Sequence, residues 1–305
     1  MTQVRLHLTA RKPEVHHIAS ILDPQFEEDG VTSVLFEADE NSGQWCYSIY
    51  VDQKDVDFWT RTLKERLGDD LFGLTLEQEV LEDINWVTHT LKNLPPVSAG
   101  RFLVHGSHDR HLAKNARIPI EIDAGQAFGT GHHGTTAGCL DVLEHCLRQS
   151  SGQLGQPRRA MDIGTGSGLL AIALAKALHI PVLATDIDPI SVEVAHVNAQ
   201  INGVAPHVTC VHATGFNHRA FNAFGKADLI FANILARPLE ALARPMRAHV
   251  NPGGQIILSG LLPHQKARIT AAFARQNMIL EKWHIRDGWL TLLMRGHSPY
   301  IWTKK

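Results

Sequence analysis

The sequence predicts an α/β protein with a doubly wound, mostly parallel sheet, preceded by a smaller α+β domain. Strand and helix patterns alternate from residue 159 to residue 259. A glycine-rich turn joins the first of these strands to its helix, and the chain closes with a hairpin signal at Asp287-Gly288. Such alternation is typical of a parallel sheet covered by helices on both faces.

Residues 1–82 are predicted to form a ferredoxin-like domain. Apolar residues that alternate with period two indicate strands, and a helical period indicates helices. The expected strands are residues 4–9, 32–37, 44–51 and 71–80, and the expected helices are residues 13–22 and 55–67. This βαββαβ order is the ferredoxin-like one. Residues 83–100 lose the pattern and contain Pro95-Pro96, so we expect a linker there.

Residues 101–305 are predicted to form the main domain. The expected strands are residues 101–104, 118–122, 159–163, 181–185, 208–212, 228–232, 255–259, 278–285 and 289–294. Helices are expected up to residue 147, over residues 169–178, and from Asp188-Pro189 to residue 202. Thr135 or Thr136 is the expected N-cap of the first helix. The last two strands are joined by a tight turn, so the last strand is antiparallel to its neighbour.

Composition narrows the function classes. The chain has 305 residues, 44% of them apolar and 20% charged, with a net charge of −2. This balance gives no basic surface of the kind that binds nucleic acid, and we expect no direct nucleic-acid partner. The four cysteines form no CxxC pair, which favours reduced thiols in a cytoplasmic protein. No apolar run is long enough for a membrane span, and the N-terminus Met1-Thr2-Gln3-Val4-Arg5 lacks the apolar core of a signal peptide.

The glycine-rich turn is the clearest candidate binding site. Its glycines are Gly164, Gly166 and Gly168. They let backbone N–H groups approach a ligand at the start of a helix. Asp186 ends the next strand, where a carboxylate suits ribose hydroxyls. A dinucleotide fingerprint requires glycine where Leu169 stands, which argues against an oxidoreductase. Asp162 suits a cationic amino group rather than a pyrophosphate, so the pattern resembles motif I of S-adenosylmethionine (SAM) methyltransferases.

Asn233 is the candidate catalytic residue. It ends the predicted fourth strand of the alternating region, in Asn233-Ile234-Leu235-Ala236, and ligands gather at the carboxyl ends of parallel strands. An asparagine carbonyl there could accept a hydrogen bond from an amine and direct the nitrogen lone pair at a methyl donor. The alternative is that Asn233 only terminates the strand.

The loop from Gly125 to Thr136 is the second distinctive segment. Its glycines surround the single aromatic ring of Phe128, as suits a backbone that closes over a ligand. The adjacent His132 and His133 have no Asp, Glu or Cys at ligand spacing, so we expect no metal site.

Four motifs occur in the order found in the ribosomal protein L11 methyltransferases, the PrmA family, and resemble that family closely. They are DxGxAFGTGxHxTT from residue 123, DxGxGSGxLxIA from residue 162, DIDP from residue 186 and ANILAxPL from residue 232. The resemblance implies a class I SAM methyltransferase fold with a seven-stranded sheet and SAM as the cofactor. It implies SAM contacts at Thr136, Gly164, Asp186 and Asn233.

The resemblance also implies a substrate. In this family a small N-terminal domain recognises ribosomal protein L11, whose lysine side chains or N-terminal α-amine are methylated. Residues 1–82 match that domain only in size and pattern, so an N-methyltransferase acting on another protein or a small amine is the alternative. Gly134 and Ala124 stand where relatives commonly have proline, which leaves the loop geometry open. A SAM-binding scaffold without catalysis is a further alternative.

Other conspicuous side chains are predicted to be structural. Trp86, Trp283 and Trp289 lie at strand edges and are expected in the core. Three arginines follow the Asn233 motif, Arg237, Arg244 and Arg247, and are expected to form a solvated helix face; the alternative is that they meet an RNA-bound partner.

Overall fold

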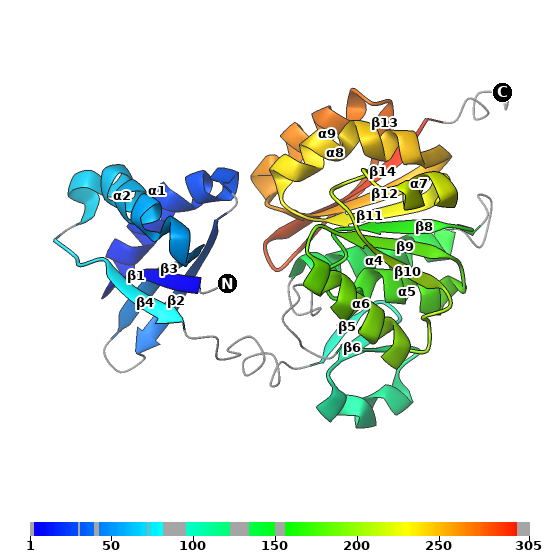
Figure 1. Ribbon diagram of the computed structural model, residues 1–305, viewed down its shortest axis with the longest axis horizontal. Coiled ribbons are helices and arrows are strands. Elements are labelled where there is room, and N and C mark those ends of the chain that lie inside the picture. Colours follow the sequence, from blue (N-terminus) through cyan, green and yellow to red (C-terminus); the bar gives the residue numbers. More distant parts are fainter. Residues whose placement is uncertain are drawn as a thin grey trace. The chain divides into compact units, whose positions relative to one another are not determined.

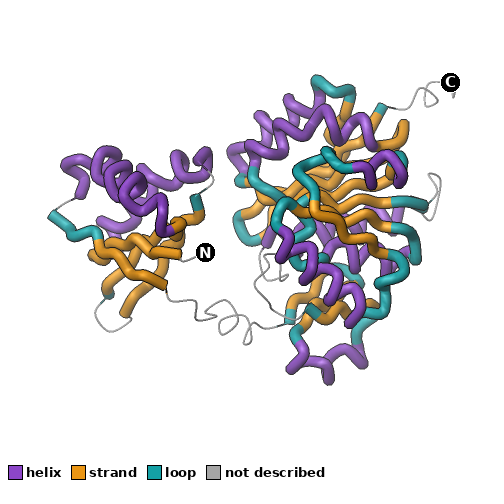
Figure 2. The backbone as a smooth tube through the Cα atoms, in the orientation of Figure 1, coloured by secondary structure: helices purple, strands orange, loops and turns teal. Residues whose placement is uncertain are grey.

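The computed structural model describes residues 3–29, 31–39, 43–71, 73–81, 96–122, 134–149 and 156–297. The chain divides into two compact units, Met1–Asn85 and Trp86–Lys305 (Figure 1, Figure 2). Each unit has its own sheet and its own buried core, and each is described by itself.

The N-terminal unit is a four-stranded antiparallel sheet with two helices on one face. Its elements are β1 (Gln3–Arg11), α1 (Lys12–Asp29), β2 (Thr32–Asp39), β3 (Gln44–Asp52), η1 (Gln53–Asp55), α2 (Val56–Leu67), η2 (Gly68–Leu71) and β4 (Glu77–Leu81). The strand order β2-β3-β1-β4 is that of a ferredoxin-like domain. Val4, Leu6 and Leu8 alternate along β1 and lie buried under the helices. The last strand begins at Glu77 and not at residue 71, because the chain first turns at Gly73 with φ of 74°.

The C-terminal unit is built on a seven-stranded sheet in which β14 alone runs against the others. Its strands are β8 (Ala160–Ile163), β9 (Val182–Asp186), β10 (Val208–His212), β11 (Ala227–Asn233), β12 (Val250–Leu261), β13 (Met278–Arg286) and β14 (Trp289–Gly296). The order is β10-β9-β8-β11-β12-β14-β13. Asp287 and Gly288 join the last two strands with φ values of 49° and 81°. Positive φ at both positions is the geometry of a type I′ hairpin turn, so the predicted hairpin is confirmed.

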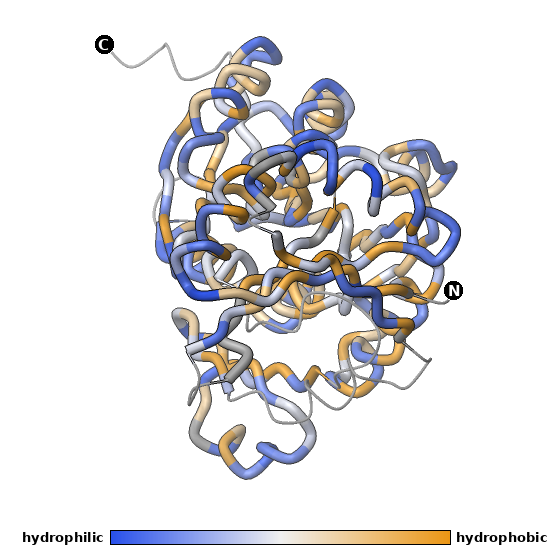
Figure 3. The backbone as a smooth tube through the Cα atoms, turned by 90° about the vertical axis from the view of Figure 1, so that its left-hand side faces the viewer, coloured by the Kyte–Doolittle hydropathy of each residue, from blue (hydrophilic) through white to orange (hydrophobic). Residues whose placement is uncertain are grey.

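Helices cover both faces of this sheet (Figure 1). One face carries α4 (Gly134–Gln149), α5 (Leu169–Leu178) and α6 (Pro189–Ile201), and the other carries α7 (Arg219–Phe224), α8 (Ala236–His249), η4 (Pro263–Gln265) and α9 (Lys266–Ala274). All four residues of β8 are buried because both of its faces are covered. Apolar residues follow the strands, and hydrophilic residues gather on the outer turns of the helices (Figure 3).

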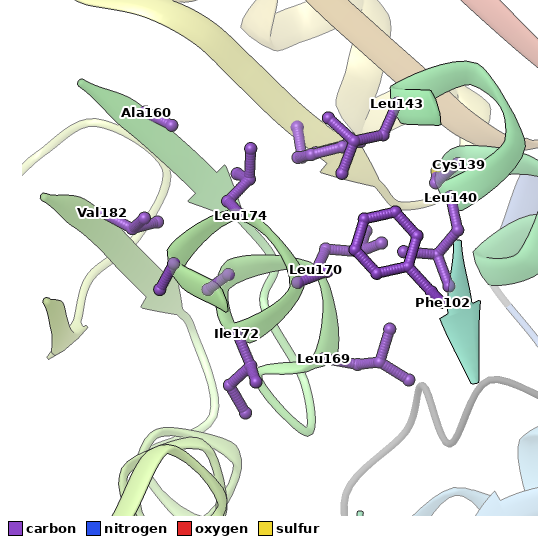
Figure 4. Packing of buried hydrophobic residues seen from close by; sticks show 14 of the residues in the cluster. Phe102, Cys139, Leu140, Leu143, Ala160, Leu169, Leu170, Ile172, Leu174 and Val182 are labelled. Carbon is purple, nitrogen blue, oxygen red and sulfur yellow. The ribbon is translucent and has the colours of Figure 1, made fainter. Parts of the chain in front are cut away.

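A small three-stranded sheet extends the core on the α4 and α5 side. It contains β5 (Val97–Ala99), β6 (Phe102–His105) and β7 (Ile118–Glu121), with η3 (Ser107–Asn115) between the last two. Phe102 of this sheet packs with apolar residues of α4 and α5 (Figure 4). Residues 83–100 were expected to be a linker, but their end forms strand β5, because this part of the segment pairs with β6.

Helix α4 lies very close to the sheet through two glycines. A Cβ on Gly134 would stand 2.7 Å from the Arg286 carbonyl oxygen, and one on Gly138 would stand 2.7 Å from Thr291 Oγ1. The helix begins at Gly134, so Thr135 and Thr136 lie inside its first turn and the expected N-cap at one of them is wrong. Both threonines are buried by this close packing.

The expected cap at Asp188 is confirmed. Its carboxylate accepts hydrogen bonds from the N–H groups of Ile190 and Ser191, and Pro189 is the first residue of α6. These bonds hold the start of α6 just after the end of β9.

Trp283 is not in the core, contrary to the sequence prediction. It lies on the edge strand β13, 49% exposed, and Lys266 Nζ is 3.9 Å from its ring centroid. An edge strand has one sheet neighbour, which leaves this ring room to meet solvent and a cation. Trp289 is half-buried, and Trp86 lies outside the described residues. Arg237 and Arg244 are exposed on α8. No helix in the described ranges is both long and apolar enough to cross a membrane.

Glu144 joins α4 to the turn between β5 and β6. Its carboxylate accepts hydrogen bonds from Arg101 Nε at 2.6 Å and from Arg148 Nε at 2.7 Å. The Arg101 hydrogen bond is the main reason why the pKa of Glu144 is lowered to about 2. Gly100 has φ of 59°, and a Cβ there would stand 2.7 Å from Glu144 Cβ. Because the β5–β6 turn lies this close to α4, Arg101 can donate its hydrogen bond to the Glu144 carboxylate.

Replacing Glu144 with glutamine should lower the free energy of unfolding by about 1–2 kcal/mol at pH 7, since a charge-assisted pair is lost. The folded pKa of about 2 lies below the usual unfolded value of about 4.3. The wild-type advantage should therefore persist above pH 4.3 and disappear as pH falls towards 2. Denaturant unfolding at several pH values measures this, with Glu193→Gln on exposed α6 as control. Parallel pH curves for wild type and Glu144→Gln would contradict it.

Candidate functional site

The glycine-rich turn between β8 and α5 is held against the end of β9. The N–H groups of Gly164 and Thr165 both donate to the Thr185 carbonyl, at 2.8 and 2.9 Å. Gly164, Gly166 and Gly168 have φ values of 71°, 53° and 83°. This left-handed region strongly favours glycine, so the three alternate glycines are required by the backbone path itself.

The turn is also packed too tightly for side chains. A Cβ on Gly164 would collide with Ile234 Cγ2 at the end of β11. A Cβ on Gly168 would stand 2.9 Å from Ala195 Cβ in α6. The turn therefore lies in direct contact with the segment that follows Asn233.

Asp162 is a fully buried carboxylate directly before the turn. Its Oδ2 accepts hydrogen bonds from Thr165 Oγ1 at 2.7 Å and from the Ala171 N–H at 3.1 Å. Its Oδ1 has no hydrogen-bond partner among the residues that the structure describes. Burial raises the pKa of Asp162 to about 7, because the charged form is poorly solvated there. A nearby cation would stabilise the ionised form.

Asp186 ends β9 beside the turn. Its Oδ2 accepts a hydrogen bond from the Gly166 N–H at 2.8 Å, and its Oδ1 accepts one from the Asp188 N–H at 3.0 Å. Each carboxylate oxygen keeps a further lone pair, and the side chain is half-buried. A carboxylate fixed in this way can accept hydrogen bonds from two adjacent hydroxyls.

Asn233 contacts the first turn of α4. Its Nδ2 donates to Thr136 Oγ1 at 3.2 Å, although the two residues are far apart in the sequence. The side-chain oxygen Oδ1 of Asn233 accepts no hydrogen bond from any described residue. The amide is therefore oriented from its nitrogen end, and its oxygen remains available as an acceptor.

Most of the sequence-predicted site residues lie at one edge of the sheet. The glycine turn contacts Asp186 through Gly166 and contacts the residue after Asn233 through Gly164, and Thr136 contacts Asn233. Phe128 belongs to residues 123–133, which lie outside the described residues. Within the described parts of the chain, no group of three His, Cys, Asp or Glu side chains could hold a metal ion. The binding and catalytic roles of these residues stay predictions.

Ser259 is a polar residue at this edge that the sequence analysis did not select. Its hydroxyl lies 3.2 Å from the Thr135 carbonyl oxygen, 3.4 Å from the Leu290 carbonyl oxygen and 3.0 Å from Thr291 Oγ1. The sequence held a signal for it, because Ser259 follows an apolar run and is the last residue of the strand expected at residues 255–259, as Asn233 follows the strand expected before it.

Asp162→Asn should change how the stability of the ligand-free protein depends on pH. The folded pKa of about 7 lies above the unfolded value of about 3.9. Stability from this group is therefore full below pH 3.9 and is lost as pH rises through 7, at up to about 1.4 kcal/mol per pH unit. Unfolding measured from pH 5 to 8 should show this loss in wild type and in the exposed control Asp57→Asn. Its presence in Asp162→Asn as well would refute the assignment.

Comparison with known proteins identifies one family of methyltransferases, in agreement with a glycine turn and an asparagine at the same edge of the sheet. The family model "Ribosomal protein L11 methyltransferase (PrmA)" matches residues 17–297. A ribosomal protein L11 methyltransferase of Mesorhizobium japonicum is 47% identical over 299 residues, which cover 97% of this chain and 100% of the relative. One of Sinorhizobium fredii is 44% identical over 292 residues, covering 96% and 99%.

A solved structure is similar as well. The crystal structure of a ribosomal protein L11 methylase from Lactobacillus delbrueckii subsp. bulgaricus has a TM-score of 0.56 and 30% identity, covering 67% of this chain and 100% of that one. This similarity confirms the predicted class I methyltransferase fold. The family match covers both units and nearly the whole length, and so the chain belongs to the ribosomal protein L11 methyltransferase (PrmA) family.

Proposed function

We propose that this chain transfers methyl groups from SAM to amino groups of ribosomal protein L11. The acceptors are lysine side chains, the N-terminal α-amine, or both. One observation carries the proposal in a chain of this family: Asn233, fixed by Thr136, directly precedes the residue that packs against the glycine turn. The glycine turn proposed to bind the cofactor and an amide that can receive an amine therefore lie side by side.

The residues at this edge fit SAM. The buried Asp162 Oδ1 has no partner among the described residues, and a cationic amino group would satisfy it. The turn at Gly164 has no side chain that would block a close approach. Asp186, held by two backbone N–H groups, is placed to accept from ribose hydroxyls.

SAM supplies an electrophilic methyl group on a positively charged sulfur. Methyl transfer to an amine is an in-line displacement, so the protein must align two reactants and exclude water and needs no covalent nucleophile. The Asn233 carbonyl accepts a hydrogen bond from the N–H of the incoming amine and thereby directs the nitrogen lone pair. Thr136 prevents the amide from rotating by accepting from its nitrogen.

The acceptor amine must be neutral before it reacts. An α-amine has a pKa of about 8 and a lysine about 10.4, so the α-amine loses its proton more readily at pH 7. A buried, largely apolar surrounding lowers the pKa of an amine, which favours the neutral form. Beside Asn233, Thr136 and Ser259 are buried and uncharged, so these two side chains add no negative charge that would favour the protonated amine.

We assign recognition of ribosomal protein L11 to the N-terminal unit. Its core is separate from the core of the methyltransferase unit, so its surface can evolve without disturbing the cofactor site. We take residues 1–82 as the recognition domain and residues 101–305 as the methyltransferase domain; of the intervening residues 83–100, strand β5 pairs with β6 of the methyltransferase domain. A cytoplasmic location is part of the same proposal, and it is supported by the free thiols of Cys46, Cys139 and Cys210.

Purified protein should transfer labelled methyl from SAM to purified ribosomal protein L11. Removing residues 1–82 should leave the Kd for SAM within about threefold and lower kcat/KM for ribosomal protein L11 by about 100-fold or more, equal to about 2.7 kcal/mol of lost recognition.

Other purified ribosomal proteins and small amines serve as alternative acceptors in the same assay. Label on one of these, with none on ribosomal protein L11, would refute the substrate. Equal methylation by the shortened chain would refute the role of the N-terminal unit.

Asn233→Ala should lower kcat about 100-fold or more, because the contact that orients the acceptor amine is lost. The Kd for SAM, measured by calorimetry, should change less than tenfold, since the glycine turn and Asp186 remain in place. Asn222→Ala, on the exposed side of α7, is the matched control and should behave as wild type. A normal kcat in Asn233→Ala would exclude this mechanism without affecting the SAM assignment.

A further inference from the structure

Strand β12 is irregular opposite Thr291. Leu258 pairs with Leu292 and Leu261 pairs with Leu290, so Ser259 and Gly260 together oppose one residue of β14. This two-against-one arrangement is a β-bulge, a device that often re-aims side chains next to active sites. The bulge lies beside the candidate site, because Ser259 is the direct neighbour of Asn233 across the β11–β12 ladder.

Gly260 makes room for the backbone that follows Asn233. Its φ is 79°, and a Cβ there would stand 2.5 Å from the Ile234 carbonyl oxygen and 2.9 Å from the Ile234 carbonyl carbon. Both atoms belong to the main chain, so no side-chain rotation could relieve the collision. On its other side Ile234 fills the space left by Gly164. Ile234 is therefore held between two glycines, and the position of Asn233 follows from it.

Ser259 fixes the partner of Asn233. Its hydroxyl lies 3.2 Å from the Thr135 carbonyl oxygen in the first turn of α4 and 3.4 Å from the Leu290 carbonyl oxygen in β14. Thr136, the residue after Thr135, accepts the Asn233 amide hydrogen bond. Thr291 lies 3.0 Å from the same hydroxyl, and both side chains are almost fully buried. A buried hydroxyl with satisfied partners holds the helix turn at a defined height above the sheet.

We propose that Ser259 and Gly260 are positioning residues that hold the Asn233–Thr136 pair in its working geometry. The proposal rests on the proposed function, because it gives this pair a part in methyl transfer. Gly260 acts on Asn233 through the Ile234 backbone, and Ser259 acts on Thr136 through the Thr135 carbonyl. Neither residue needs to touch SAM or the acceptor amine.

Gly260→Ala should move the Asn233 end of β11 and lower kcat for ribosomal protein L11 roughly tenfold or more, since small displacements at a reacting centre are costly. The Kd for SAM should change by a smaller factor than kcat, because the added methyl group meets the Ile234 backbone directly and reaches the turn at Gly164 only through the Ile234 side chain. Gly203→Ala is the matched control. Gly203 also has positive φ, 70°, but a Cβ there meets nothing within 4 Å, so it isolates backbone strain from collision.

A double-mutant cycle separates positioning from a general defect. If Gly260 acts through Asn233, adding Gly260→Ala to Asn233→Ala should lower kcat no further. Losses that multiply in the double variant would overturn the proposal. Ser259→Ala adds no bulk and serves if Gly260→Ala does not fold. It should lower kcat about three- to tenfold, and no further loss should appear when it is added to Thr136→Ala.

A readout independent of turnover completes the test. The side-chain amide resonances of Asn233, assigned by their loss in Asn233→Ala, should shift in Gly260→Ala and Ser259→Ala but not in Gly203→Ala. Unshifted resonances in both site variants would overturn the proposal. Absence of ribosomal protein L11 methylation by wild type would refute the proposed function instead, and the same resonances would still decide the positioning.

Discussion

Ile234 follows β11 and packs between two other segments of the sheet. One is the turn that follows β8, at Gly164, and the other is β12, at Gly260. Ile234 has room only because the positions facing it on either side, Gly164 and Gly260, carry no side chain. The glycine turn, the asparagine and the end of β12 are therefore spaced by one close packing contact. Close-packed interiors resist small displacements, so this contact fixes the dimensions of the whole edge.

The electrostatics of the edge follow from the same packing. Asp162 and Asp186 lie on either side of the turn, one fully buried and one half-buried, and each is held by hydrogen bonds from the turn or the helix it begins. Burial, and to a smaller extent the negative charge of Asp186, raise the pKa of Asp162 to about 7. Such a pair attracts a ligand with one positive charge and neighbouring hydroxyls, and disfavours phosphates.

Local pattern was sufficient to predict much of this structure. Strands such as β8 and β10 and the whole of α5 could be predicted because burial on one or both faces dictates their apolar spacing. The glycine turn could be predicted because positive φ demands glycine.

Contacts between distant segments could not be predicted in this way. The hydroxyl of Ser259 meets the Thr135 carbonyl across 124 residues of sequence, and no local period encodes that pairing. Trp283 was misjudged because the sequence of β13 does not show that it becomes an edge strand. The start of α4 was misplaced because Gly134, rather than a threonine cap, lets its first turn approach the sheet.

The antiparallel insertion of β14 has a consequence for the order in which the protein is made. Thr291 and the start of β14 pack against Ser259, yet β14 follows every other strand of this sheet in the sequence. Synthesis proceeds from the N-terminus, so the N-terminal unit can fold before β14 has joined the edge that carries the candidate site. A nascent chain on the ribosome would thus have a finished N-terminal unit before it has a working active site.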